Sequence, residues 1–271
     1  MHAHPELVLA PTATKIPADA RGRVLVCGSH AGAYAGYLAC RAGVRAVILN
    51  DAGVGLEQAG IGALAQCEGL GVAAAAVAHV SARIGDAEDT LAGGIISHCN
   101  ALAAAAGVEP GMACSEAGVL LTRAPQGRGE GATYQEARTL AGLNRHGLRI
   151  VCVDSVSLVT DEDIGQVVLS GSHGGVVSGQ RALAIRVAAA AAFYNDAGIG
   201  KDEAGVSRLP VLDEQNIAAG AVAAASARVG DGLSTYESGV LSRVNATAQA
   251  MGMAPGMRAR DAVELVVAPA I

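Results

Sequence analysis

Apolar residues in this chain come in short runs that alternate with helical patterns. In the first half, the runs Arg23–Cys27, Val44–Asn50 and Val72–Val80 predict β-strands. The stretches between them, Gly32–Ala42 and Glu57–Glu68, predict helices. Strands that are apolar on both faces and alternate with helices are typical of a parallel sheet covered on both sides. We therefore expect an α/β fold with a mostly parallel sheet.

The rest of the first half has a weaker pattern. We expect Asp86 or Asp89 to cap a long helix that ends near Gly107. A short fourth strand is expected at Gly118–Leu121.

Two further segments complete the predicted elements. The stretch Tyr134–Asn144 indicates a helix, and Arg149–Asp154 indicates a strand. In the second half, Ser234 and Glu237 have the spacing of a capping box at a helix start. From residue 165 to about Val267, the second half repeats the predicted pattern of strands and helices of the first half.

The second half of the chain repeats motifs of the first half. A Gly-Ser-His sequence follows an apolar run in each half, Asn-Asp-Ala-Gly follows the next run, and Ser-Ala-Arg-x-Gly-Asp follows the third. Most of these motifs recur at an offset of 145 residues: 50–53 with 195–198, and 81–86 with 226–231. We interpret this as a tandem duplication of a βαβ-rich unit of about a hundred residues, longer than the repeats of solenoid proteins, with the copies related by a pseudo-twofold axis.

The repeat defines the expected domain organisation. Residues 1–21 form an N-terminal arm, 22–121 the first repeat unit, 122–164 an insertion between the repeats, and 165–271 the second unit.

Composition excludes several classes of protein. Hydrophobic residues make up 51% of the 271 residues and aromatic residues only 2%, and the net charge is −6 without a basic run. A partner that is a nucleic acid or an anionic membrane is therefore not expected. Although the mean hydropathy is +0.37, no unbroken apolar stretch reaches the length of about 20 residues that a membrane span needs.

The apolar excess and the cysteines suggest where the protein works. We attribute the excess to a buried parallel sheet and to the interface of a homo-oligomer. The six cysteines are scattered without a Cys-x-x-Cys pair, and no apolar segment led by Lys or Arg stands at the N-terminus. We therefore expect a reduced, cytoplasmic protein.

Ligands of open α/β sheets bind beyond the carboxyl ends of the strands, where the repeated motifs lie. The loop Gly171–Gly175 follows a strand and reads Gly-Ser-His-Gly-Gly. Its glycines, Gly171 and Gly174 among them, would let backbone amides approach an anion, as in a phosphate cradle. The same residues also fit a tight strand-to-helix turn in which the serine caps the helix.

Serine and histidine stand side by side in this loop in both halves. Ser172 and His173 are the candidates for catalysis, and Ser29 and His30 are candidates for substrate contacts. Because neighbouring side chains point in different directions, their adjacency alone does not establish a catalytic pair.

Asparagine and aspartate follow the next strand in each half. We take Asp196 as a catalytic candidate, and Asn195 and Asp51 as substrate-binding candidates. A carboxylate at this place could orient a histidine, bind a metal or accept hydrogen bonds from a substrate. Alternatively, it could form an Asx turn with the glycine-rich loop.

Three cations complete the candidate site. Arg83 and Arg228 could each grip a carboxylate or phosphate, or could pair with the aspartate three residues further on. Lys201 follows the Asn-Asp motif of the second half and is a candidate general base or anion binder; a surface lysine is the alternative.

These residues favour an enzyme that acts on a small molecule. The first hypothesis is a hydrolase of an amide- or ester-like bond, with loop amides stabilising the oxyanion. The alternatives are a phosphate-using transferase or phosphorylase on a nucleoside-like substrate, and a non-catalytic ligand-binding or scaffold protein. No cofactor is predicted; a divalent metal held by His30, His173, Asp51 and Asp196 is the weakest alternative, because their spacing is not that of a metal site.

Overall fold

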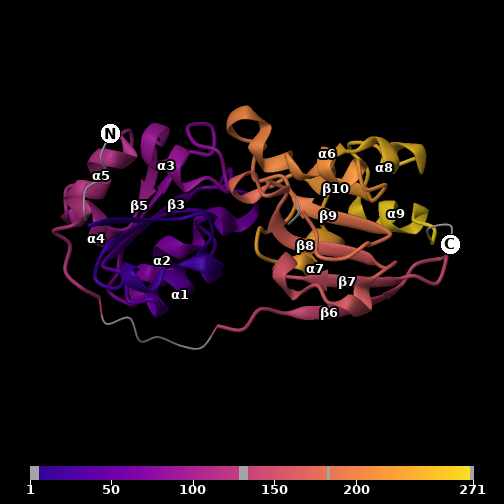
Figure 1. Ribbon diagram of the computed structural model, residues 1–271, viewed down its shortest axis with the longest axis horizontal. Coiled ribbons are helices and arrows are strands. Elements are labelled where there is room, and N and C mark those ends of the chain that lie inside the picture. The colour runs from indigo at the N-terminus through magenta and orange to yellow at the C-terminus, as the bar shows by residue number, and fades with distance from the viewer. Residues whose placement is uncertain (1–5, 128–133, 182–183, 269–271) are drawn as a thin grey trace. The chain divides into compact units, whose positions relative to one another are not determined.

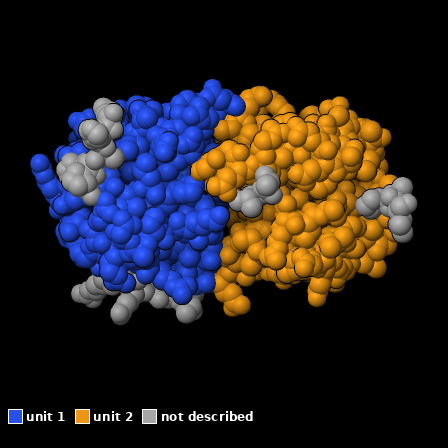
Figure 2. Space-filling view, in the orientation of Figure 1, with its two compact units in different colours: residues 1–54, 58–134, 200–202 blue, residues 55–57, 135–199, 203–271 orange. Residues whose placement is uncertain are grey.

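The computed structural model describes residues 6–127, 134–181 and 184–268. Its contacts divide the chain into two compact units, coloured separately in Figure 2. The first unit comprises residues 1–54, 58–134 and 200–202, and the second comprises residues 55–57, 135–199 and 203–271.

The sheet of the first unit has its five strands in chain order. Strands β1 to β4 are parallel, and β5 pairs with β4 in the antiparallel direction. The strands are β1 (Leu7–Ala10), β2 (Val24–His30), β3 (Ala46–Asn50), β4 (Ala73–Val77) and β5 (Ile96–Cys99).

Helices cover both faces of this sheet (Figure 1). Leu25 and Val47 face one apolar cluster with α1 and α2, whereas Val24 and Ile48 face another with α4 and α5. This alternation explains why consecutive positions in the central parts of β2, β3 and β4 are apolar. The helices are α1 (Ala33–Arg41), α2 (Gly62–Gly69), α3 (Ala87–Gly93), α4 (Ala101–Ala105) and α5 (Cys114–Leu121).

The sheet of the second unit has six strands in the order β11-β10-β9-β8-β7-β6. The four central strands are parallel, and both edge strands are antiparallel to their neighbours. The strands are β6 (Arg138–Leu143), β7 (Arg149–Val153), β8 (Val167–His173), β9 (Ala191–Asn195), β10 (Ala218–Val222) and β11 (Leu241–Val244).

This second sheet is also buried on both faces. Leu169 and Phe193 belong to the cluster that includes α8 and α9, and Val168 and Tyr194 belong to the cluster that includes α6. The helices are α6 (Arg208–Asp213), α7 (Gly232–Glu237), α8 (Ala246–Ala250) and α9 (Ala259–Ala262). The expected α/β class with mostly parallel sheets is thus confirmed.

Each unit includes three residues from the other half of the chain. Gly55–Glu57 belongs to the second unit and Gly200–Asp202 to the first. The amide of Leu56 donates to the carbonyl of Ala224, and the amide of Lys201 donates to the carbonyl of His79. These segments open the 3-10 helices η3 (Leu56–Ile61) and η8 (Lys201–Val206).

The long helix expected after Asp86 is wrong. The segment instead forms α3, β5 and α4 in succession. Asp86 does cap α3, but Gly94 is extended and ends it, and Asn100 caps α4 by accepting a hydrogen bond from the amide of Ala103. The Gly-Gly pair and the following isoleucines outweighed the helical pattern, because glycine weakens a helix and β-branched residues favour strands.

Two other predicted elements have the wrong type. Gly118–Leu121 lies in α5 rather than in a strand. Tyr134 precedes β6, and Arg138–Leu143 pairs with β7 as a hairpin instead of forming a helix. The hairpin turn at Asn144 and Gly147, with Gly147 at φ 80°, supplies the turn signal that the helical interpretation ignored.

The second half does not repeat every element of the first. Among its described residues, the connection between β8 and β9 has the 3-10 turn η6 (Val177–Gly179) and no α-helix, where the first unit has α1; residues 182–183 lie outside the described part. The predicted capping box is also wrong, because Asp231 caps α7 and accepts from the amide of Ser234.

Within the described ranges, no helix is long and apolar enough to span a bilayer.

Candidate functional site

The repeated motifs lie at the carboxyl edge of each sheet, as the sequence predicts. In the first unit the loop that ends at Asp86 packs directly on β2. The amide of Gly85 donates to the carbonyl of Gly28 over 2.7 Å, and a Cβ on Gly28 would lie 2.6 Å from the amide nitrogen of Asp86. In the second unit Gly171 meets Asp231 in the same way. These glycines allow two backbones to approach closely, which needs no ligand.

The two predicted serines support neighbouring turns. Ser29 Oγ accepts a hydrogen bond from the amide of Ala13, in η1 (Ala13–Lys15), over 2.9 Å. Ser172 Oγ accepts from the amide of Val156, in η4 (Val156–Leu158), over 2.9 Å. Each hydroxyl therefore fixes the chain that follows the preceding strand.

The two predicted histidines bind the loop that follows them. The amides of Gly32 and Gly175 donate to Nδ1 of His30 and His173, respectively, over 3.1 Å. Since Nδ1 accepts, each ring carries its proton on Nε2. Burial lowers the pKa of His30 to about 4, so this ring is neutral at pH 7.

Ser172 and His173 are therefore held by different partners, the amides of Val156 and Gly175. The amide of Gly174 donates to the carbonyl of Asn195. The loop amides that would form an anion cradle thus already donate within the protein.

Asn50 and Asn195 are fully buried and tie the strand-end loops together. Nδ2 of Asn50 donates to the carbonyl of Ala82, and Nδ2 of Asn195 donates to that of Ala227. Both side-chain amides thus have a backbone partner, and the substrate-binding role of Asn195 stays a prediction.

Asp51 and Asp196 make the same backbone contacts. Each accepts from the amide of a glycine two residues on, Gly53 or Gly198, over about 3 Å in an Asx turn. Each also accepts a second amide hydrogen bond from the chain that follows the next strand. For Asp196 this donor is the amide of Ala224. Among the described contacts, the Asp196 carboxylate therefore accepts hydrogen bonds only from backbone amides.

Asp51 differs from Asp196 because its second amide donor belongs to a histidine, His79, whose ring also contacts the carboxylate. Nδ1 of His79 lies 2.9 Å from Oδ1 of Asp51, whose side chain is only 4% exposed, compared with 26% for His79. Burial alone would raise the pKa of Asp51, but hydrogen bonds from His79, Ser97 and two amides outweigh it and lower that pKa. Asp51 is therefore a carboxylate that orients His79.

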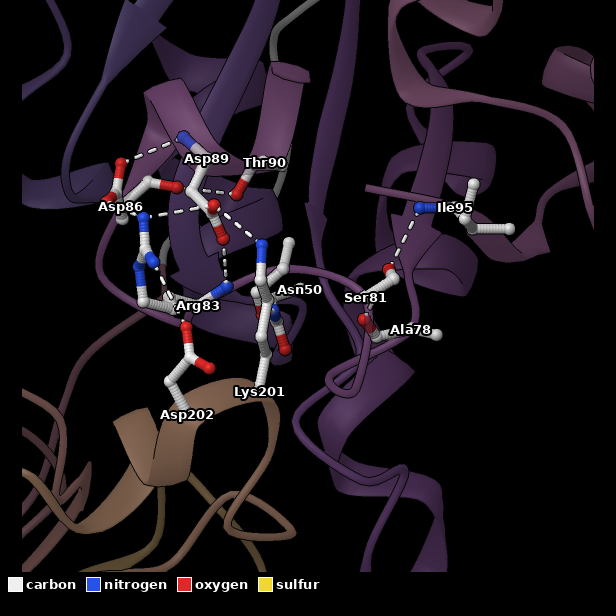
Figure 3. Close-up of polar contacts among 11 residues, drawn as sticks. Asn50, Ala78, Ser81, Arg83, Asp86, Asp89, Thr90, Ile95, Lys201 and Asp202 are labelled. Carbon is white, nitrogen blue, oxygen red and sulfur yellow. Dashed lines mark hydrogen bonds and ion pairs between the residues drawn. The ribbon is translucent and has the colours of Figure 1, made fainter. Parts of the chain in front are cut away.

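A group of charges lies next to this pair. The Nζ atom of Lys201 lies 2.7 Å from Oδ1 of Asp89, and Arg83 Nη2 lies 3.0 Å from the same oxygen. Figure 3 shows both cations pointing to Asp89, with Asp202 on the other side of Arg83. Burial raises the pKa of Asp89, but the hydrogen bond from Lys201 and further contacts lower it overall. The backbone of Lys201 also lies next to that of His79, because the Lys201 amide donates to the His79 carbonyl.

The arginines of both units have acidic partners. Arg83 contacts Asp86, Asp89 and Asp202. Arg228 contacts Asp231 and Glu57 at 2.9 and 3.1 Å. Both guanidinium groups thus form the ion pair with the aspartate three residues further on, which the sequence offered as the alternative to binding a ligand.

The candidate residues are distributed over both units. Lys201 belongs to the first unit, whereas Ser172, His173 and Asp196 belong to the second. In the first unit, Lys201 and Asp51 lie beside His79, which the sequence interpretation missed. The two halves do not share this histidine, because the second half has Ala224 at the place of His79. Comparing the two halves position by position at the offset of 145 residues singles out Lys201, and it would also have shown His79.

Among the described residues, no three His, Cys, Asp or Glu side chains gather as metal ligands do. The chain matches no protein-family model, no curated protein and no solved structure.

Proposed function

We propose that the protein hydrolyses an amide- or ester-like bond of a small molecule at the carboxyl edge of the first sheet. One observation carries this proposal: the buried Asp51 carboxylate orients His79 with an Nδ1–Oδ1 distance of 2.9 Å at the ends of β3 and β4. A histidine oriented by a buried carboxylate is suited to acid–base catalysis near neutral pH.

The proposed step is attack by water. With its Nδ1 proton donated to Asp51, His79 accepts a proton from water at Nε2 while the water oxygen bonds to the carbonyl carbon of the substrate. Collapse of the tetrahedral intermediate breaks the bond to the leaving nitrogen or oxygen, which takes the proton back from His79. Asp51 stabilises the imidazolium that forms between these two events.

We further propose that Lys201 supplies positive charge to this centre. Asp89 and the His79 carbonyl hold the lysine from two sides, through its Nζ and its amide. Its ammonium group would stabilise the oxyanion in place of the loop amides, which donate elsewhere. A phosphate-using transferase has less support, since the alternative relied on those amides and on Arg228, which contacts Asp231 and Glu57.

We also propose that the two units arose by tandem duplication. The support is the recurrence of detailed contacts: Asn50 and Asn195, and likewise Asp51 and Asp196, bind corresponding partners at an offset of 145 residues. The first unit would then have acquired His79 for catalysis. The pseudo-twofold arrangement, the homo-oligomer and the cytoplasmic location stay predictions.

The test is a hydrolysis screen with matched variants. Purified protein is assayed against linear and cyclic amides, lactones and simple esters. His79→Ala should lower kcat by about 100-fold or more, and Asp51→Asn should also lower it. Asp196→Asn is the matched control, because Asp196 makes the same backbone contacts without a histidine. Absence of turnover across the panel, or equal rates for Asp51→Asn and Asp196→Asn, would show the proposal to be wrong.

A further inference from the structure

Arg208 is a buried cation in the second unit. It opens α6 and is 3% exposed. Its Nη1 and Nη2 atoms donate to the carbonyls of Ala184 and Gly175, and its guanidinium carbon lies 4.8 Å from the ring centre of Tyr194. Its Nε is the one buried side-chain nitrogen or oxygen of the described residues that has no hydrogen-bond partner.

Within the described part of the chain, no anionic side chain compensates this charge. Every ion pair found among those residues involves a cation other than Arg208. An arginine stays protonated in proteins, so burial cannot neutralise it. Tyr194 does not supply the charge either, because burial raises the pKa of its hydroxyl despite the nearby Arg208. A buried charge without a counter-ion is costly, and carbonyl groups and an aromatic face compensate it only in part.

The fold itself does not require an arginine at this place. The corresponding residue of the first unit is Ala63, 145 positions earlier. Its amide donates to the Ala31 carbonyl over 2.7 Å, as the amide of Arg208 donates to Gly174 over 2.8 Å. Gly36 of α1 packs so closely on Ala63 that a Cβ would lie 2.8 Å from the Ala63 Cβ. The same strand-end geometry is thus built with a small apolar residue.

Arg208 contacts the loop that follows β8 in the second unit. Gly174 and Gly175, which accept its hydrogen bonds, follow β8 directly. This is the edge at which parallel sheets bind ligands. The loop amides are engaged, but the guanidinium has five N–H donors. Two hydrogen bonds to carbonyls use two of them, and the Tyr194 hydroxyl is a further partner of this guanidinium.

We propose that Arg208 anchors a binding site for a small oxyanion, a carboxylate or phosphate group of a ligand, at the loop that follows β8. The anion accepts from Nε and from a remaining Nη hydrogen and neutralises the buried charge. Since Arg208 is almost fully buried, the anion reaches it when the loop that directly follows β8 moves away from α6. Gly174 and Gly175 of this loop accept two of the hydrogen bonds that Arg208 donates.

The experiment measures thermal unfolding of the full chain in sodium phosphate, sodium succinate and sodium chloride at equal ionic strength. A ligand that binds only the folded state raises Tm as its concentration exceeds its Kd. We expect a saturable rise of Tm in phosphate or in succinate, relative to chloride, for the wild type. Which of the two gives the rise distinguishes a phosphate from a carboxylate ligand.

Two variants identify the site. Arg208→Met should lose the saturable rise, whereas Arg243→Met, which removes an arginine of the same unit that is 48% exposed, should keep it. If Arg208→Met does not fold, titration of the arginine Nε–H resonances of the wild type replaces it. Arg208→Lys serves for assignment, because it keeps the charge and removes the Nε–H group. A rise that persists without Arg208, an unmoved Nε–H resonance, or no saturable rise in either anion would overturn the proposal.

Discussion

Hydrogen bonds to backbone decide the role of most polar residues at the strand ends. Ser29, His30 and Asn50 are the residue types of an active site, yet each uses its side chain to hold a neighbouring loop. This follows from burial, because a loop packed against a sheet edge must pair its amides and carbonyls. His79 is different, since its partner is a side-chain carboxylate.

His30 should make the protein sensitive to acid. Its pKa is about 4 in the folded chain and about 6.5 in the unfolded chain, so the unfolded state binds the proton more readily between these values. The free energy of unfolding therefore falls as the pH drops from about 6.5 towards 4, by up to about 3 kcal/mol.

The variant His30→Asn should reduce this loss, because the amide oxygen of asparagine can accept the Gly32 hydrogen bond without binding a proton. Urea unfolding at pH 7.5 and pH 5 measures the difference. His146→Asn is the control, since His146 is exposed. An equal loss of stability in His30→Asn and in the wild type would contradict the expectation.

At the scale of elements, close backbone packing connects each motif to the sheet. The Ser-Ala-Arg-x-Gly-Asp loop lies on the first glycine of the Gly-Ser-His loop in both units, and the amides of Gly85 and Gly230 donate to that glycine's carbonyl. The two motifs thus pack closely against each other, although about 50 or more residues separate them in the chain.

Gly171→Ala should therefore be strongly destabilising. Its Cβ would overlap with the amide of Asp231 and with the carbonyl of Asp154, both of them backbone groups that cannot give way easily. We expect a loss of about 3 kcal/mol in the free energy of unfolding.

Gly69→Ala is the matched control for that variant. Gly69 ends α2, and a Cβ added to it would have no other atom within 4 Å, so alanine should stabilise the protein by about 0.5 kcal/mol. Urea denaturation measures both variants. Similar stabilities of the two would show that the close approach at Gly171 is not rigid.

Sequence patterns predicted the central elements better than the peripheral ones. The runs that became β2, β3 and β4 are mostly apolar on both faces, because helices cover both faces of the sheet. The pattern at Ile96–Cys99 is ambiguous, since this strand is short and flanked by helices. Such short stretches adopt the structure that tertiary packing favours, whatever their weak helical preference.

At the scale of the whole molecule, order along the chain does not decide which unit a residue belongs to. Gly200–Asp202 comes from the second half but belongs to the first unit, where Lys201 contacts Asp89 and Asp202 contacts Arg83. Leu56 stands at the position of Lys201 in the other half, and Ser234 at that of Asp89.

Lys201→Met should consequently weaken the first unit. Loss of the Nζ–Asp89 contact, whose carboxylate is 11% exposed, should cost about 1 kcal/mol, because Arg83 still contacts Asp89. Hydrogen exchange measured by mass spectrometry should become faster in α3, and remain unchanged in α7, the helix at the corresponding place of the second unit.

Leu56→Met is the control for this variant, since it changes the corresponding position in the second unit. Faster exchange in α7 rather than in α3 after Lys201→Met would contradict the assignment of Lys201 to the first unit.

The sequence by itself determined the α/β class, the central strands and the position of the repeated motifs at the strand ends. Those features depend on local runs of apolar residues and on turns, which a short window of sequence contains. Only the tertiary structure decided that Asp51 pairs with His79, that Lys201 lies beside that pair, and that Arg208 is buried without a counter-ion among the described residues. Each of these contacts depends on which segments that are distant in the sequence pack together. A short window of one sequence contains no pattern that indicates such packing.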